Sequence, residues 1–166
     1  MIARFDRMQC VLAPPLGITL CWSKGLLASL KLGWSSDLAE DKSPYPEDLD
    51  MKKSLVGYVE RGETVWPDLP IDMSGLSIFS RKVLMTLKNK ITFGQTVSYG
   101  GLAKMAGSPK AARAVGRIMA SNPWPLLIPC HRVVGADGSL VGFSGSGLEM
   151  KAYLLNLEQG KGARRL

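Results

Sequence analysis

The stretch SYGGLAKMAGSPKAARAVGRIMA, residues 98–120, decides the fold of the second half of the chain. Its first residue, Ser98, is a favourable N-cap for a short helix, and Gly107 suits the left-handed position that ends such a helix. Ser108 and Pro109 then suit the N-cap and first position of a second helix, which we expect to run to the end of the stretch. Two short helices joined by a Gly-Ser turn predict a helix-turn-helix unit, whose second helix commonly lies against DNA.

The second of these helices is basic and unusually slim. Lys110, Arg113 and Arg117 give it positive charge. A helix with few bulky side chains can approach a nucleic-acid groove closely. A helical hairpin packed inside a core, with small residues at the crossing, is the alternative interpretation. The small residues are Ala111, Ala112, Ala114 and Gly116.

The charge of the chain is unevenly distributed. The 166 residues carry a formal net charge of +7. From Gly75 onward there are thirteen Lys and Arg residues against three acidic ones, a net +10, whereas residues 1–74 hold eight against eleven, a net −3. A basic half beside an acidic half indicates contact with a polyanion, and a solvated basic surface without a partner is the alternative.

Composition excludes several classes of protein. With 46% apolar and 21% charged residues, the chain is neither a disordered chain nor a collagen-like repeat nor a coiled coil. No run approaches 18 apolar residues without a charge, so we expect no membrane span. No apolar stretch follows the charges of Met1–Arg7, so we expect no secretory signal. Three cysteines give no disulfide framework and indicate a reducing, cytoplasmic compartment.

The first half has the pattern of a small α/β domain. Short apolar runs between Pro and Gly turns over Met8–Leu32 predict an antiparallel meander. The polar stretch Ser35–Pro46 predicts an exposed loop, and Leu49–Glu60 has helical spacing. The Pro-rich segment Trp66–Ser74 is the candidate linker. We therefore expect two domains, residues 1–74 and 75–166.

A second group of informative residues follows the helix-turn-helix. The apolar run Leu126–Ile128 leads to Pro129, and Cys130 and His131 stand directly after it. His131 is the only histidine of the chain, so any Cys-His or histidine acid–base chemistry must use it. A cysteine beside a histidine and an arginine can be a reactive thiol. A free cysteine packed as a small core residue is the alternative.

A glycine-rich loop and a helix come next. The loop Gly142–Gly147 can bring backbone N–H groups close to a ligand. Leu148–Glu158 has helical spacing and ends on Glu158, an acidic residue that could orient His131. On pattern alone, an exposed glutamate at a helix end is the simpler interpretation of Glu158.

Together these motifs resemble one family. The segment Ile128–Val133 (IPCHRV), preceded by Asn122-Pro and by Ala111–Gly116 (AARAVG), is similar to the O6-alkylguanine-DNA alkyltransferases, and the likeness extends to Thr96–Gly100 and to the early Pro15-Leu-Gly hairpin. The resemblance implies an α/β N-terminal domain, a small antiparallel sheet plus helices of ribonuclease H-like type. An α-helical DNA-binding domain of winged-helix type would follow it. It also implies a single-turnover methyltransferase that moves an alkyl group from O6 of guanine, and less readily from O4 of thymine, in duplex DNA to its own cysteine.

The resemblance assigns roles to residues at matching positions. Cys130 would accept the alkyl group, His131 would take the thiol proton through a water, and Glu158 would orient His131, in a relay that extends the logic of a catalytic triad. Asn122 would brace the segment that joins the recognition helix to the active site. Tyr99 would crowd a DNA phosphate and face guanine N3, so that the damaged base flips out of the stack.

The slim helix would lie in the minor groove. Arg113 would fill the gap left by the flipped base, because a planar cation stacks well and can pair with the orphaned cytosine. Backbone groups of Cys130, Val133 and Ser144 would read the guanine edge. The small residues that would let the helix approach the groove are Ala111, Ala112, Ala114 and Gly116.

The sequence departs from the family pattern at a few positions. Phe143 stands where a tyrosine is common, and Leu84 stands where a tryptophan is common. The glycine loop Ser144–Gly147 is one residue longer than usual. No Cys/His cluster lies outside the site, so we expect no metal and no diffusible cofactor.

The expected partner is double-stranded DNA that contains O6-alkylguanine. We expect a monomer without an obligate protein partner, located in a nucleoid or a nucleus, and leave cooperative binding to DNA open. Two alternatives differ in their use of Cys130. A non-enzymatic binder or regulator of alkylated DNA needs no intact thiol, and a cysteine hydrolase would turn over and would not need the basic helix.

Overall fold

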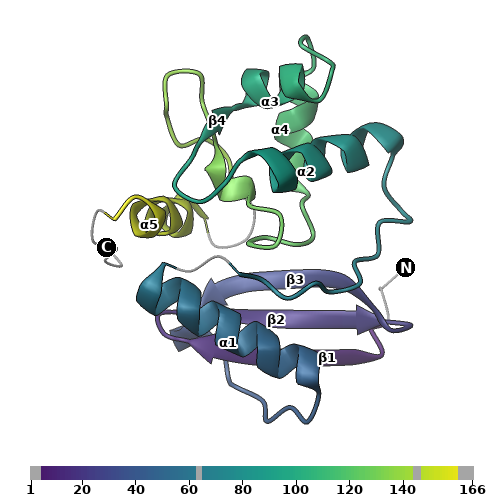
Figure 1. The fold of residues 1–166 in the computed structure, drawn as a ribbon, viewed down its shortest axis with the longest axis vertical. Coiled ribbons are helices and arrows are strands. Elements are labelled where there is room, and N and C mark those ends of the chain that lie inside the picture. The colour runs from purple at the N-terminus through teal and green to yellow at the C-terminus, as the bar shows by residue number, and fades with distance from the viewer. Residues whose placement is uncertain (1–4, 63–64, 144–146, 161–166) are drawn as a thin grey trace. The chain divides into compact units, whose positions relative to one another are not determined.

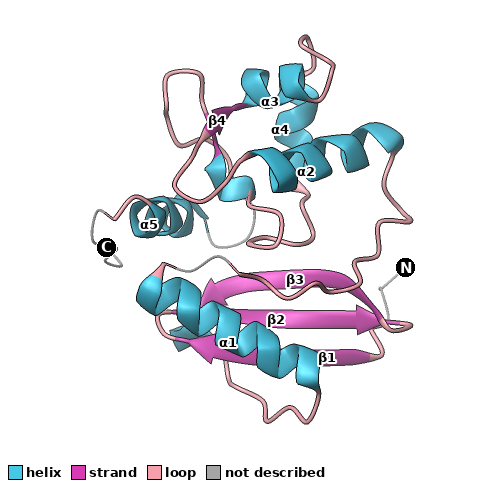
Figure 2. Ribbon diagram, viewed as in Figure 1, coloured by secondary structure: helices cyan, strands magenta, loops and turns pink. Residues whose placement is uncertain are grey.

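The computed structural model describes residues 5–62, 65–143 and 147–160. They form two units, Met1–Asp72 and Met73–Leu166, each with its own buried core (Figure 1). The first unit is a sheet with a covering helix, and the second is mostly helical (Figure 2). The predicted small antiparallel sheet plus helices is therefore confirmed. No helix in these ranges combines the length and apolar character needed to cross a bilayer.

The sheet of the first unit is an antiparallel meander, as predicted, in the order β1 (Arg7–Ala13), β2 (Leu16–Ser23) and β3 (Leu26–Trp34). The turn between β2 and β3 has left-handed backbone at Lys24 and Gly25, with φ of 51° and 76°, as a two-residue hairpin requires. The central strand has the most buried side chains of the three, since it has a neighbour on each side.

The helix α1 (Pro46–Arg61) packs mainly against β1 (Figure 1). It begins at Pro46 rather than at the predicted Leu49, because proline suits the first helical position, where an N–H is not needed. The short turn η1 (Ser35–Asp37) lies in the predicted loop. The apolar side chains that α1 buries most fully are Met51, Leu55 and Tyr58, and the carboxylate residue Asp48 is buried with them.

Part of the predicted linker Trp66–Ser74 pairs with the sheet of the first unit. Leu27 N donates to Pro70 O at 2.7 Å and Asp72 N donates to Leu27 O at 3.2 Å, which makes a parallel bridge between Leu27 and Ile71. β3 is an edge strand of the sheet, and an extended segment can pair with the backbone along such an edge.

The second unit is built on α2, α3 and α4, which pack against one another in all three pairs. Two short strands, β4 and β5, pair in parallel, with Val97 opposite Val133, and this pairing holds the residues after Cys130 beside the start of α3. The last helix, α5, packs on the turn η2 that contains Cys130. The bounds are α2 (Ile78–Lys90), β4 (Val97–Ser98), α3 (Tyr99–Met105), α4 (Ala112–Ala120), η2 (Cys130–Arg132), β5 (Val133–Val134) and α5 (Gly147–Glu158).

The helix-turn-helix forms as predicted at its first helix and differs at its second. The Ser98 side chain accepts a hydrogen bond from Gly101 N at 2.9 Å, and Gly107 has a φ of 78°. However, α4 begins at Ala112, not at Pro109. Gly107 and Ser108 complete the end of α3, where Ser108 N donates to Ala103 O, so the chain still has to turn before α4 can start.

Candidate active site

A closed turn between α4 and η2 presents Cys130. Asn122, directly after α4, donates from Nδ2 to Ile128 O at 2.8 Å and accepts at Oδ1 from Trp124 N at 3.1 Å. Ile128 N also donates to Trp124 O at 2.8 Å. The turn has left-handed backbone at Leu126, with a φ of 71°, although leucine seldom adopts it. Asn122 therefore ties both ends of the turn together, and the chain leaves it with Cys130 buried.

The Cys130 thiol is protonated at rest but surrounded by groups that favour the thiolate. Burial raises the pKa of Cys130 above its ordinary value. The Asn122 side chain, the Lys151 ammonium and the backbone N–H groups of Cys130 and His131 act in the opposite direction. Such a thiol needs a base to take its proton before it can attack.

A buried histidine–glutamate pair lies directly next to this cysteine. The His131 Nε2 and Glu158 Oε1 atoms are 2.7 Å apart, and both side chains are almost completely buried. Because a carboxylate can only accept, we assign the proton to Nε2, which leaves Nδ1 as the acceptor atom of the ring. Nδ1 has no hydrogen-bond partner among the described residues. The interpretation of Glu158 as an exposed helix-end residue is wrong, because α5 turns its last residue into the core of the unit.

Tyr99 lies at the start of α3 and reaches the loop after β5. Its hydroxyl donates to Val141 O at 2.8 Å. Burial raises the pKa of Tyr99, and the charge of Cys130 adds to the effect, so the two side chains are close in space. A Cβ at Gly116 would lie 3.9 Å from the Tyr99 ring, an ordinary contact distance, so Gly116 stands beside this ring.

Lys151 is a central residue of the site that the sequence analysis did not single out. Its ammonium is buried and donates to Val133 O at 2.7 Å and Val141 O at 2.9 Å, and it stands 5.8 Å from the centre of the Tyr99 ring. Burial lowers the pKa of Lys151, and Cys130 partly opposes this. A signal was available, since Lys151 falls on the same stripe of the helix as Leu148 and Leu155, where a charge is unusual.

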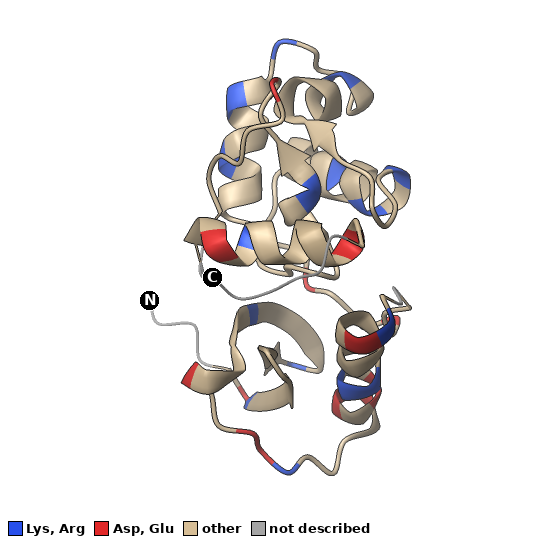
Figure 3. Cartoon of the chain, turned by 90° about the vertical axis from the view of Figure 1, so that its left-hand side faces the viewer, with Lys and Arg blue, Asp and Glu red and all other residues tan. Residues whose placement is uncertain are grey.

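The predicted DNA-contacting residues of the slim helix lie on α4 and in the turn directly before it. Arg113 and Arg117 are exposed, whereas Val115 and Met119 face the core, so α4 is clearly amphipathic. Figure 3 shows Lys and Arg positions on several elements of this unit and only a few acidic ones. Ser144 lies outside the described residues. The remaining predicted residues, Ala111, Ala112, Ala114 and Gly116, are partly exposed.

Comparison with known proteins identifies the family. The model of the 6-O-methylguanine DNA methyltransferase DNA-binding domain matches residues 78–160, half of the chain. The chain belongs to this family. The match begins at α2 and continues past the end of α5, so it contains Cys130, His131 and Glu158 together with the helix-turn-helix.

Related proteins extend the likeness. The constitutive methylated-DNA–protein-cysteine methyltransferase of Bacillus subtilis is 40% identical over 114 residues, which cover 69% of this chain and 67% of that protein. The mouse methylated-DNA–protein-cysteine methyltransferase is 57% identical over 77 residues, 46% of this chain. The aligned part spans only 36% of the mouse protein, about a third of its length. A crystal structure of Mycobacterium tuberculosis OGT in complex with DNA matches with a TM-score of 0.74 and 32% identity, covering 94% of each chain.

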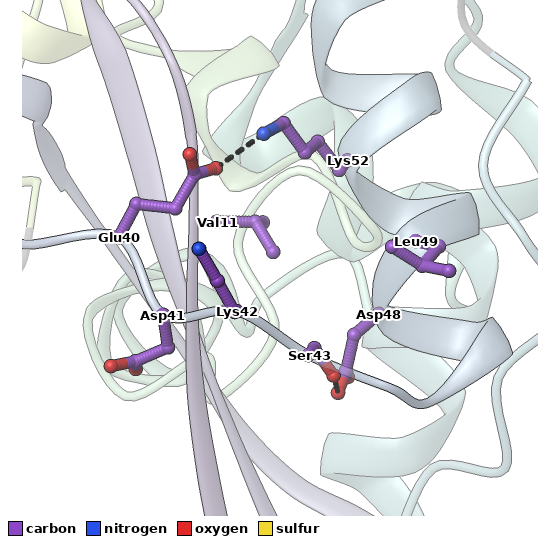
Figure 4. Close-up of a pocket in the computed structure, with 8 residues that line it drawn as sticks. All are labelled: Val11, Glu40, Asp41, Lys42, Ser43, Asp48, Leu49 and Lys52. Atoms are coloured by element: carbon purple, nitrogen blue, oxygen red, sulfur yellow. Dashed lines mark hydrogen bonds and ion pairs between the residues drawn. The ribbon is translucent and has the colours of Figure 1, made fainter.

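A separate cavity lies in the first unit, outside the segment matched by the family model. Its volume is about 350 Å³, and Figure 4 shows the ion pair between Glu40 and Lys52, 2.7 Å apart, at its edge. It shares no residue with the site around Cys130. In the described ranges, His, Cys, Asp and Glu nowhere gather in a group of three that could hold a metal ion.

Proposed function

We propose that the protein repairs O6-alkylguanine in duplex DNA by moving the alkyl group to Sγ of Cys130. The observation that carries the proposal is the buried Cys130 beside the His131–Glu158 pair, within the segment that the family model matches. Its relatives are named for the same transfer. The finer assignments, a ribonuclease H-like first domain (residues 1–74) and a winged-helix-like second domain (residues 75–166), belong to this proposal.

The chemistry is a displacement at carbon. His131 Nδ1 takes the thiol proton, directly or through a water, and the thiolate attacks the alkyl carbon. The new S–C bond forms as the C–O6 bond breaks. The electron pair of the C–O6 bond stays on the guanine, which takes up a proton and becomes ordinary guanine. The thioether at Cys130 is stable, and among the described residues of the site we identify no second nucleophile that would remove the group, so we expect each molecule to react once.

The other predicted residues support this reaction. Asn122 positions the turn before Cys130 and stabilises the thiolate. Tyr99 faces the flipped base, and its hydroxyl, held on Val141 O, is a donor that can turn toward guanine N3. Backbone groups of Val133 and Ser144 contribute to the guanine pocket. Val133 O also accepts a hydrogen bond from Lys151. This bond occupies one of the two lone pairs of the carbonyl oxygen, so the other is available to the base.

Access to the base comes from α4. The helix lies in the minor groove through its small residues, and Arg113 enters the stack in place of the flipped nucleotide. We propose that the protein acts as a monomer, requires no diffusible cofactor, and works where chromosomal DNA is. O4-alkylthymine is a lesser substrate in this proposal.

Intact mass measurement tests the function directly. Incubation with duplex DNA containing O6-methylguanine should add about 14 Da, the net mass of one CH2 group, at Cys130 and nowhere else. Cys130→Ala should gain nothing, whereas Cys21→Ala, which removes another buried thiol, should react like the wild type. No adduct on the wild type, or an equal adduct on Cys130→Ala, would refute the proposal.

A further inference from the structure

The carboxylate of Glu158 is held by more than His131. Arg132 donates from Nε to Oε2 at 2.8 Å and from Nη2 to Oε1 at 3.0 Å, and Gly94 N donates to Oε2 at 3.2 Å. The third nitrogen of the guanidinium, Nη1, donates to Ile91 O at 2.8 Å. Arg132 is only 6% exposed and the Glu158 side chain is fully buried. The arginine is therefore fixed at both ends, on the carboxylate and on the C-cap residue of α2.

We propose that Arg132 is a positioning residue that keeps His131 in its neutral, proton-accepting form by balancing the charge of Glu158. The inference rests on the proposed function, because the neutral form matters only if His131 must take the proton of Cys130.

The need for a balancing charge follows from the geometry. A buried carboxylate 2.7 Å from an imidazole, with no other cation near, would stabilise the imidazolium. A histidine already protonated has no free acceptor nitrogen and cannot activate a thiol. The guanidinium of Arg132 forms a bidentate pair with the same carboxylate, so the carboxylate and guanidinium are neutral as a unit while they still orient the ring.

The charges around His131 agree with this assignment. Burial lowers the pKa of His131, the hydrogen bond and charge of Glu158 raise it, and Arg132 and Lys151 lower it again, with a net decrease. The charged groups that act on the ring are Glu158 and Lys151 from α5 and Arg132 from η2. Burial raises the pKa of Glu158, but its partners His131 and Arg132 outweigh burial and bring it to about 2. The guanidinium of Arg132 pairs with both carboxylate oxygens of Glu158, so it can keep Glu158 ionised when His131 is neutral.

The single histidine makes the proposal measurable without any activity assay. Only one imidazole Cε1–H signal exists in the chain, so a proton–carbon NMR titration reports His131 without assignment work. In the wild type we expect a midpoint below 6.5, the ordinary value, despite the adjacent carboxylate. A midpoint at or above 6.5 would overturn the proposal, and this measurement requires no variant.

Variants of Arg132 test the cause. Arg132→Met should raise the His131 midpoint by about one unit or more, the size of a shift produced by an unbalanced charge at contact distance. Arg132→Lys keeps the cation and should stay within about half a unit of the wild type, less than one full charge contact produces. Lys88→Met is the matched control, because it removes one exposed positive charge from α2 and should leave the midpoint unchanged.

Methyl transfer gives a second readout. Below the new midpoint Arg132→Met should react more slowly than wild type, by up to about tenfold for a shift of one unit, and the deficit should disappear as the pH rises above that midpoint. If Arg132→Met does not fold, the wild-type midpoint and the Arg132→Lys midpoint still decide. If the His131 midpoint does not move in folded Arg132→Met, the role of Arg132 is refuted, while the proposed function is not affected. A wild type that transfers no methyl group refutes the proposed function and leaves the titration results to be judged by themselves.

Discussion

Asn122→Ala is the most informative single change for the turn that presents Cys130. It removes two hydrogen bonds of 2.8 and 3.1 Å and leaves Ile128 O and Trp124 N without the amide that satisfies them. Ile128 and Trp124 are at most 1% exposed, so water cannot replace that amide without opening the turn. At about 1–3 kcal/mol for each of the two buried groups left unsatisfied, we expect the free energy of unfolding to fall by roughly 2–6 kcal/mol.

The assay is urea unfolding of the variant and the wild type, supported by thermal melting. A loss of this size corresponds to a decrease in Tm of about 4–24 °C for a chain of this length. Ser121→Ala is the control, since it removes a hydroxyl that donates to Arg117 O at 3.0 Å on the exposed end of α4, and it should cost less than about 0.5 kcal/mol.

A comparison with Asn122→Asp separates stability from reactivity. Aspartate keeps the acceptor for Trp124 N but loses the donor to Ile128 O, and it places a negative charge beside Cys130. It should therefore react more slowly than its stability alone would suggest, because a nearby anion raises the pKa of the thiol. If Asn122→Ala is no less stable than Ser121→Ala, the bracing role of Asn122 is refuted.

Three further outcomes follow from the site. Arg113→Ala should slow repair of duplex DNA far more than reaction with free O6-benzylguanine, and equal slowing in the two assays would exclude a role in base flipping. Lys151→Met should reduce the rate with free O6-benzylguanine by about tenfold at neutral pH and less at high pH, because the thiolate loses a favourable charge, whereas exposed Lys90→Met should change nothing. Glu158 has a pKa of about 2 in the folded protein against an ordinary 4.5. Its ionised carboxylate therefore contributes roughly 3 kcal/mol to the free energy of unfolding, and this contribution is present above pH 4.5 and lost as the pH falls toward 2. In Glu158→Gln this part of the acid sensitivity should disappear in urea melts at a series of pH values.

Local signals predicted the elements whose ends depend on their own residues. Ser98 and Gly107 mark the two ends of α3 because an N-cap hydroxyl and a left-handed glycine act within a few residues of themselves. The hairpin of β2 and β3 is similar, since its turn residues determine the connection. The start of α4 was predicted wrongly, because Ser108 O accepts from Ala111 N across a turn at Pro109 and Lys110, and the helix begins only after this turn.

The candidate site divides in the same way. The adjacency of Cys130 and His131 is visible in the sequence. Pattern alone did not establish which residues bury and orient them, because those residues lie far along the chain, and only the family resemblance gave Glu158 this role. Glu158 meets His131 only through the packing of α5 on η2, and Arg132 acquires its role only because Ile91 O and Glu158 approach it from two different helices. A charged side chain on an apolar stripe, such as Lys151, is the one signal in the sequence that such a buried network leaves. Burying an ammonium group without hydrogen-bond partners costs so much free energy that a lysine on an apolar stripe predicts acceptor atoms in the core. Here those acceptors are the carbonyls of Val133 and Val141, and through them the lysine is bound to the same loop that holds Tyr99.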